Sequence, residues 1–298
     1  MARFLSSIRQ HAAALRILII LTVIFGVLYP LAVTAVAQIP GLKSKADGSL
    51  IKSNGQVIGS SLIGQSFTDK DGNPLVQYLQ SRPSAAGAGY DPTASGASNL
   101  GPESIVDTLP DPKVKGDTGK QSLLTLVCSR SVAIGKLEGV DGSRPFCTSG
   151  GVGAVLAVFY AGPGYAGKVT RAVSVNGACP AKPFLATYKG VAVECAKFGA
   201  DYSTGKIVPI RGTAPAHSAV PADAVTASGS GLDPEISPAY ATLQAPRIAK
   251  ERGISAAQVL AVISDFRVGR DLGFLGEARV NVFKVNLALD RSYPYKGK

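Results

Sequence analysis

The hydrophobic positions of this chain are distributed unevenly, and the longest apolar run lies near the N-terminus. Residues 17–37 are 21 consecutive uncharged positions, ILIILTVIFGVLYPLAVTAVA. At about 1.5 Å per residue, a helix of this length spans the hydrocarbon core of a bilayer. Arg3, Arg9 and Arg16 precede the run without an acidic residue, so we expect residues 1–16 to stay in the cytoplasm. The pattern predicts a single transmembrane helix that carries an extracytoplasmic domain.

A cleaved signal peptide is the competing interpretation of the same run. Ala35-Val36-Ala37 has the small-residue spacing of a cleavage site. The run is longer than the usual core of about 7–15 apolar residues in a signal peptide, and Tyr29 and Pro30 interrupt it. We expect Pro30 to kink the helix. Both interpretations place residues 39–298 outside the cytoplasm.

The flanks of the outer part, residues 39–112 and 214–298, predict an α+β domain. Asn54-Gly55 between apolar positions predicts a β-hairpin with a type I′ turn. Ser237 and Gly253 suit the two ends of a helix over 238–252, and Ser255 with Gln258 forms a capping box at the start of the next helix. The alternation of apolar and polar residues over 283–290 predicts a half-buried strand.

The middle of the chain, residues 113–213, has a different pattern. Short apolar runs alternate with Gly and Pro, which favours strands and turns. These runs are Leu123–Val127, Val152–Tyr160, Val169–Val175, Val191–Val193 and Ile207–Ile210. The sequence therefore predicts a β-rich lobe inserted between the two halves of the outer domain.

All four cysteines, Cys128, Cys147, Cys179 and Cys195, lie in this middle segment. An even number of cysteines outside the cytoplasm predicts disulfides, and the wide spacings without nearby histidine do not suit zinc. Three pairings are possible. The neighbour pairing, Cys128–Cys147 with Cys179–Cys195, is our working choice, and it makes the inserted lobe disulfide-stapled.

The net charge of +11 arises largely in the middle segment, where residues 113–211 include 13 basic and 5 acidic residues. These charges are dispersed and no aromatic-interleaved basic stripe accompanies them, so we do not expect a nucleic-acid partner. The only histidines are His11 and His217, and no nucleophile motif is present. Asp91 and Asp233 leave a carboxylate hydrolase as one hypothesis, but both stand before Pro in turn sequences. We predict neither catalytic residues nor a metal or cofactor.

A series of short blocks in the flanks resembles the KdpC family of the Kdp-type potassium-transporting ATPase complex. The blocks follow one another in family order over about two thirds of the chain, and the series is more specific than any single block. They include Gly26-Val-Leu-Tyr29-Pro30-Leu31, Leu62-Ile63-Gly64-Gln65-Ser66-Phe67, Arg82-Pro83-Ser84, Tyr90-Asp91-Pro92, Ser95–Pro102, Val225–Pro234, Gln244-Ala245-Pro246-Arg247, Gly273–Glu277 and Leu287–Asp290.

The resemblance implies a non-catalytic subunit of a high-affinity ATP-driven potassium uptake complex. It implies a retained membrane helix, a potassium-channel-like partner that forms the pore, and a P-type ATPase partner that hydrolyses ATP. The role of this chain would be assembly and stabilisation of that complex. The alternative is a membrane-anchored envelope protein whose disulfide-rich lobe binds a ligand and which has no part in transport.

We expect contacts with the partner subunits at two surfaces. One is the face of the membrane helix around Gly26, Tyr29 and Pro30. The other is the set of loop blocks that contains Arg82, Tyr90, Ser98, Asn99, Ser228, Ser230, Asp233, Gln244 and Arg247. The middle segment is not part of the resemblance, and because it is basic we expect it to lie away from the path of incoming potassium.

Overall fold

The computed structural model describes residues 2–177 and 183–297. The chain divides into two compact units, Met1–Leu62 (unit 1) and Ile63–Lys298 (unit 2). The structure has mixed α and β content, in agreement with the α+β prediction.

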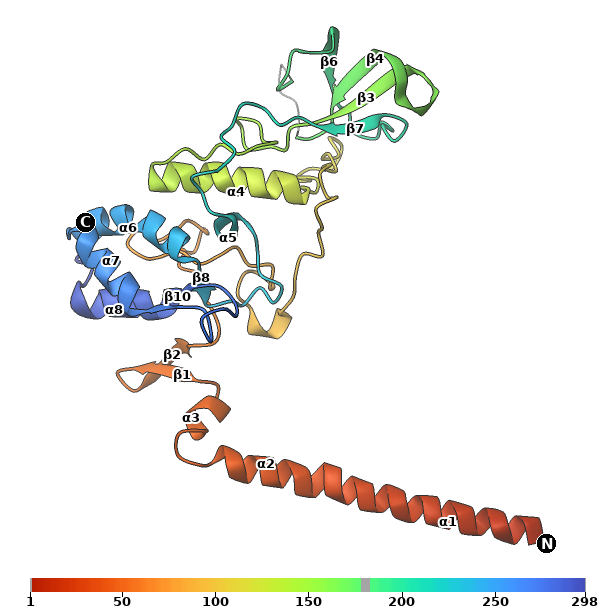
Figure 1. Ribbon diagram of the computed structural model, residues 1–298, viewed down its shortest axis with the longest axis vertical. Coiled ribbons are helices and arrows are strands. Elements are labelled where there is room, and N and C mark those ends of the chain that lie inside the picture. The colour runs from red at the N-terminus through yellow and green to blue at the C-terminus, as the bar shows by residue number, and fades with distance from the viewer. Residues whose placement is uncertain (1, 178–182, 298) are drawn as a thin grey trace. The chain divides into compact units, whose positions relative to one another are not determined.

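Unit 1 begins with a long apolar helix (Figure 1). It consists of α1 (Ala2–Val23), a π-helical turn (Ile24–Leu28) and α2 (Tyr29–Ala37). The part Ile8–Ala37 is long and apolar enough to cross a membrane, and its hydrophobic side chains are exposed in the isolated chain. The predicted N-terminal apolar helix is therefore confirmed.

The π-helical turn stands immediately before Pro30, where we expected a kink. Proline has no N–H, and its ring collides with the carbonyl of the residue four positions earlier. The Tyr29 amide donates to the Ile24 carbonyl five positions back, which widens the turn. The helix continues through Pro30, and the Thr34 hydroxyl donates to the Pro30 carbonyl at 2.8 Å.

A short helix, α3 (Lys43–Ala46), and a hairpin complete unit 1. The hairpin pairs β1 (Leu50–Ser53) with β2 (Gln56–Ser60) in antiparallel register. Asn54 and Gly55 form its turn with φ values of 51° and 80°. Both angles are positive, as a type I′ turn requires, so the predicted hairpin is confirmed.

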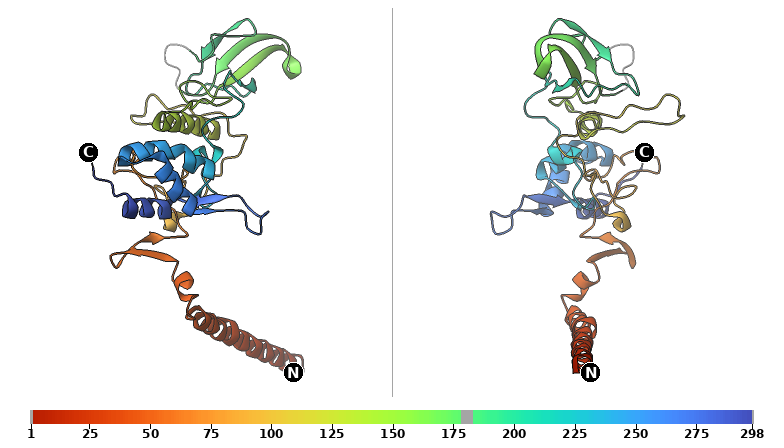
Figure 2. Two further views of the ribbon diagram at one scale, coloured as in Figure 1. Left: turned by 60° about the vertical axis from the view of Figure 1, so that its left-hand side comes forward. Right: turned by 90° about the vertical axis from the view of Figure 1, so that its right-hand side faces the viewer.

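The first part of unit 2, residues 63–122, is almost entirely irregular and contains one 3₁₀ turn, Pro92–Ala94. The C-terminal part supplies the regular framework (Figure 2). It consists of α5 (Ala222–Val225), α6 (Pro238–Arg252), α7 (Ala256–Asp265), α8 (Val282–Ser292) and a small sheet with strand order β8 (Glu235–Ile236), β10 (Arg279–Asn281), β9 (Arg267–Val268).

The ends of α6 and α7 follow the sequence prediction. The Ser237 hydroxyl accepts the Tyr240 amide at 3.1 Å, and Gly253 ends α6 in the left-handed region with φ 67°. Ser255 and Gln258 form both hydrogen bonds of the capping box at the start of α7. These helix ends depend on local sequence, so they could be predicted without the tertiary structure.

The strand predicted over 283–290 is wrong, because this segment forms helix α8. The Asn281 side chain caps it by accepting the Lys284 amide at 3.0 Å. Val282, Val285, Asn286 and Leu289 are buried, and their spacing of three and four residues is that of a helical face. Apolar residues at 283, 285 and 289 fit the two-residue period of a strand and also lie on one broad face of a helix. The alternation therefore could not distinguish a strand from a helix.

The middle segment begins with a helix, which corrects the expectation that Leu123–Val127 belongs to a β-rich lobe. Helix α4 (Leu123–Glu138) has Ser122 as its N-cap and Gly139 in the left-handed conformation after its end. Its side chains Val127 and Ile134 pack against the main hydrophobic core, which is formed by α5–α8 and the small sheet. Figure 1 shows α4 lying beside α6.

The remaining apolar runs of the middle segment form the predicted strands. A five-stranded sheet has the order β5 (Thr187–Tyr188), β6 (Val191–Cys195), β4 (Ala166–Ser174), β3 (Val155–Gly162), β7 (Lys206–Pro209). The pairs are antiparallel except β4 with β6, which is parallel. Leu156, Val158 and Ala172 are fully buried on one face, so this sheet has a small core of its own.

A disulfide joins Cys128 of α4 to Cys147 in the loop that leads to β3. This confirms the first pair of the working choice. The second expected pair involves Cys179, which lies outside the described residues, so Cys179–Cys195 stays a prediction.

Loss of the Cys128–Cys147 cross-link should destabilise unit 2. The bridged residues are 19 positions apart, and closing a loop of this size contributes about 3 kcal/mol in the chain-entropy model. For the full chain in detergent, we expect Cys128→Ser/Cys147→Ser to melt about 6–12 °C lower. Either single replacement should lower the melting temperature as much as the double replacement, since each removes the same disulfide. A double variant that melts like the parent would contradict this.

Candidate functional site

The loop blocks of the two flanks meet in unit 2 and form a junction (the loop junction, residues 63–102 and 226–235). The Gly64 amide donates to the Leu232 carbonyl at 2.8 Å, and the Gly96 amide donates to the Ser230 carbonyl at 2.9 Å. The Ser84 hydroxyl donates to the Gly231 carbonyl at 2.6 Å. Residues more than 130 positions apart in the sequence are therefore held together by main-chain and hydroxyl groups.

Arg82 is the central cation of the loop junction. Its guanidinium forms an ion pair with Asp233, with Nη1 3.1 Å from Oδ2, and also donates to the carbonyls of Thr226 and Ala227. The Ser230 hydroxyl donates to Oδ1 of Asp233 at 3.3 Å. These contacts satisfy carbonyls of a loop that has no sheet partner, so Arg82 acts here as a cross-link between the flanks.

The Tyr90 ring packs against Gly64 in the loop junction. Its hydroxyl donates to the Arg82 carbonyl at 2.9 Å, and burial raises the pKa of this hydroxyl. Gly64 is buried directly beneath the ring. A Cβ at this position would collide with Tyr90 and lie 2.6 Å from the carbonyl oxygen of Asp233. Only glycine therefore allows these two segments to approach so closely.

The predicted contact residues differ in how accessible they are. Ser98 and Asn99 are exposed, and Asn99 has a left-handed backbone with φ 54°. Ser230 is half-buried, while Ser228 is buried and its hydroxyl accepts the Gly231 amide at 3.0 Å. Gln244 and Arg247 do not contact these residues and instead bond to residues 76–80 of the loop junction.

Gln244 and Asn286 form a clamp around one stretch of backbone (the amide clamp). The Gln244 side chain accepts the Gln80 amide at 2.7 Å and donates to the Gln80 carbonyl at 3.1 Å. Asn286 does the same for Leu79, at 2.7 and 2.9 Å. Each carboxamide imitates a strand partner, so the buried Leu79–Gln80 backbone has its hydrogen bonds satisfied.

Arg247 lies next to the amide clamp and pairs with Glu138 of α4. Its Nε is 3.0 Å from Oε1 of Glu138, and the two side chains are 8% and 1% exposed. The guanidinium also donates to Gln244 and to the carbonyls of Val76 and Tyr78. Burial raises the pKa of the Glu138 carboxyl, and the Arg247 charge opposes this. All these contacts of Arg247 are internal to unit 2.

Arg252 is a second arginine of the same kind, and it lies outside the predicted contact residues. Its side chain is fully buried and donates to Asp290 at 2.8 Å and to the carbonyls of Gln77 and Tyr293. The Tyr78 hydroxyl donates to the same carboxylate at 3.0 Å. A basic residue in the last turn of α6 was the only available signal, and it is typical of any helix end.

The carboxylates of the loop junction have structural hydrogen-bond partners. Asp91 accepts the hydroxyl and amide of Thr93 at 2.7 and 2.8 Å, which lowers the pKa of its carboxyl. Asp233 is paired with Arg82. A general acid needs a raised pKa and a reachable proton, so this arrangement does not favour the hydrolase hypothesis. Within 2–177 and 183–297, no group of three or more His, Cys, Asp or Glu could hold a metal.

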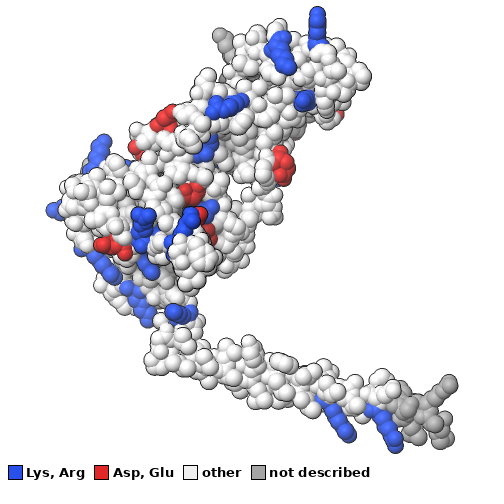
Figure 3. Space-filling view, in the orientation of Figure 1, with Lys and Arg blue, Asp and Glu red and all other residues white. Residues whose placement is uncertain are grey.

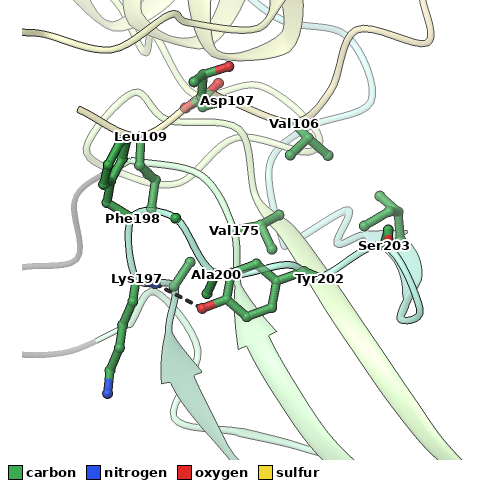
Figure 4. Close-up of a pocket in the computed structure, with 13 residues that line it drawn as sticks. Val106, Asp107, Leu109, Val175, Lys197, Phe198, Ala200, Tyr202 and Ser203 are labelled. Carbon is green, nitrogen blue, oxygen red and sulfur yellow. Dashed lines mark hydrogen bonds between the residues drawn. The ribbon is translucent and has the colours of Figure 1, made fainter. Parts of the chain in front are cut away.

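Lysine and arginine side chains do not form a continuous stripe on the face in Figure 3. A pocket of about 460 Å³ lies beside the five-stranded sheet, between residues 106–109 and the middle segment (Figure 4). Phe198, Tyr202 and Val175 line it, and the Tyr202 hydroxyl accepts the Lys197 amide at 2.9 Å. The Asp107 carboxylate at its edge accepts hydrogen bonds from Ser122, Thr125 and Gly177. This carboxylate holds the start of α4.

Gly64→Ala should destabilise unit 2 by about 1–3 kcal/mol, because the new methyl group forces the loop junction apart. The matched control is Gly229→Ala in the same junction, where a Cβ meets nothing within 4 Å and φ is not positive. Denaturant unfolding followed by tyrosine fluorescence measures both. Equal midpoints for the two variants would show that close approach at Gly64 is unimportant.

Glu138→Ala should lower the free energy of unfolding by about 3–5 kcal/mol, because it leaves the Arg247 charge buried without a carboxylate partner. Glu194→Ala is the control, since its ion pair with Arg171 is 45% and 53% exposed, and such pairs contribute at most about 1 kcal/mol. The same unfolding experiment compares them. If the two variants lost the same stability, the Glu138–Arg247 pair would not be important for joining α4 to α6.

A family model matches the two flanks, and relatives align over nearly the whole chain. The family described as "K+-transporting ATPase, c chain" matches residues 11–108 and 203–291, which is more than half of the chain. The "Potassium-transporting ATPase KdpC subunit" of Mycobacterium tuberculosis (strain ATCC 25618 / H37Rv) is 35% identical over 283 residues, 95% of this chain and 98% of the relative. The protein of the same name from Kineococcus radiotolerans is 34% identical over 287 residues, 96% of each chain.

The family match contains the whole loop junction, Gln244 and Arg247, whereas all of α4 and every strand of the five-stranded sheet except β7 lie between its two parts. The resemblance carried by the sequence blocks and the matched residues agree in order and extent. The chain therefore belongs to the KdpC family, the c chain of the K+-transporting ATPase.

Proposed function

We propose that this protein is a non-catalytic subunit of a high-affinity ATP-driven potassium uptake complex, in which it assembles and stabilises the pore-forming and ATP-hydrolysing subunits. Membership of the KdpC family, over more than half of the chain, carries this proposal. Family membership does not favour the alternative, an envelope protein with no role in transport. Hydrolysis of ATP belongs to a partner of the P-type ATPase class, and the pore belongs to a channel-like partner.

The apolar helix Ile8–Ala37 spans the membrane once, with the N-terminus in the cytoplasm and unit 2 outside. Arg9 and Arg16 precede its most apolar part, and a positive flank stays on the cytoplasmic side. The disulfide Cys128–Cys147 supports an oxidising location for unit 2. The π-helical turn before Pro30 and the small Gly26 favour close packing of this face against a helix of the channel-like subunit.

The exposed side of the loop junction is the second partner surface. Ser98 and Asn99 are free to touch a partner, whereas Arg82, Tyr90, Ser228 and the Arg82–Asp233 pair hold the loops in shape. Gln244 and Arg247 act indirectly, because they hold the Gln80 backbone and helix α4 in place rather than touch a partner. Rigid loops of this kind lose little entropy when a partner binds.

The five-stranded sheet of the middle segment lies away from the potassium entrance. The segment has 13 basic and 5 acidic residues over 113–211, and such a charge close to the entrance would repel the cation. Residues 109–202 lie outside the family model, while the KdpC relatives align over 95–96% of this chain, so most of the middle segment is shared with them.

Co-purification tests the proposed function. The full chain, tagged at its C-terminus and extracted in mild detergent, should bring down a P-type ATPase and a channel-like protein. A tagged single-pass protein of the same membrane serves as the control. A strain that lacks this chain should grow at ample but not at limiting potassium, and the full chain should restore growth. Purification without either partner, or normal growth of the deletion strain at limiting potassium, would overturn the proposal.

A further inference from the structure

A second pocket of about 460 Å³ lies between helix α4 and the loop junction (the α4 pocket). Phe67 of the loop junction and Ile134 and Leu137 of α4 form much of its apolar lining. Arg82 and Arg130 also line it, and no aspartate or glutamate does so among the residues that the structure describes. An apolar pocket of this size with a few convergent polar groups is typical of a site for a small ligand.

Arg130 differs from the other arginines that hold unit 2 together. Arg82, Arg247 and Arg252 each form an ion pair with a carboxylate. Arg130 is half-buried, and its Nη1 donates to the Val225 carbonyl at 2.9 Å, but no carboxylate of the described residues pairs with it. Burial therefore lowers the pKa of its guanidinium. A partly buried positive charge without a counter-ion destabilises the isolated chain, and an anion in the pocket would relieve this.

The Arg130 guanidinium is positioned so that the edge which suits a carboxylate is available. Val225 occupies Nη1, whereas Nε and Nη2 have no hydrogen-bond partner within 2–177 and 183–297. Neither atom is enclosed, since the unpaired enclosed side-chain atom in those ranges is Nε of Arg144. The N–H groups of Nε and Nη2 are parallel and match the two oxygens of one carboxylate. Tyr240 of α6 lines the same pocket, and no described residue hydrogen-bonds to its hydroxyl.

We propose that the α4 pocket binds a small organic monocarboxylate, whose carboxylate pairs with Nε and Nη2 of Arg130 and whose apolar part lies against Phe67 and Ile134. Asp233 already neutralises Arg82, so one unpaired positive charge faces the ligand. This charge balance favours a monoanion over a phosphate dianion. A ligand in this pocket contacts α4 and the loop junction together, so it would hold the middle segment against the framework. The inference does not depend on the proposed function.

Binding of benzoate to the full chain in detergent tests the site. Benzamide is the matched control, because it has nearly the same shape and no charge. In saturation-transfer NMR titrations, benzoate should bind about tenfold more tightly than benzamide or better, since only benzoate forms a charge-assisted pair with Arg130. Inorganic phosphate at the same concentration should not displace it. No binding of benzoate, equal binding of benzamide, or displacement by phosphate would overturn the inference.

Substitutions locate benzoate in the α4 pocket. Arg130→Gln should weaken its binding by about tenfold or more. Arg144→Gln is the matched control, because Arg144 also donates to a main-chain carbonyl, that of Val220, but lines other pockets. Its binding should equal that of the parent chain.

A second variant keeps the test valid if Arg130→Gln does not fold. Ala133 is an exposed residue of α4 at the same pocket, so Ala133→Leu should narrow the pocket, weaken benzoate binding and leave the melting temperature unchanged. Benzoate should also raise the melting temperature of the parent chain but not that of Ala133→Leu. Parent-like binding in Arg130→Gln or Ala133→Leu, or an equal loss in Arg144→Gln, would refute the site. The role in transport would then still stand, since co-purification tests it separately.

Discussion

The structure of unit 2 depends on a single constraint: an irregular chain runs through the interior, and its buried backbone groups must be hydrogen-bonded. Leu79 is fully buried and Gln80 nearly so, yet neither belongs to a strand. The carboxamides of Gln244 and Asn286 supply the missing partners from α6 and α8. Burying such groups without partners would cost a large part of the stability of a domain of this size.

The same principle explains the distribution of arginine. Arg82, Arg247 and Arg252 each donate to carbonyls of the irregular segments and to one carboxylate. A guanidinium has five donors in a fixed plane, so one side chain can satisfy several carbonyls that have no sheet partner. Several residues that the sequence predicts as partner contacts therefore bond only within unit 2. Fewer of the predicted contact residues are exposed than the sequence blocks contain.

The middle segment is joined to this framework through α4. Glu138 pairs with Arg247, and Arg130 and Arg144 donate to the carbonyls of Val225 and Val220. The disulfide then ties α4 to the loop that leads into the five-stranded sheet. A segment outside the family match is therefore linked to the framework by polar contacts with residues inside the match, so changes in α4 will affect the stability of the framework.

The sequence by itself determined the features that depend on neighbours along the chain. These are the apolar helix, the Asn54-Gly55 hairpin, the caps at Ser237 and Ser255, and the order of the family blocks. Only the tertiary structure decided that 283–290 is helical, that Leu123–Val127 begins α4, and that Gln244 and Arg247 face inward. Short apolar runs fit both periodicities, and the partner of a buried polar group can lie more than a hundred residues away, where no local pattern records it.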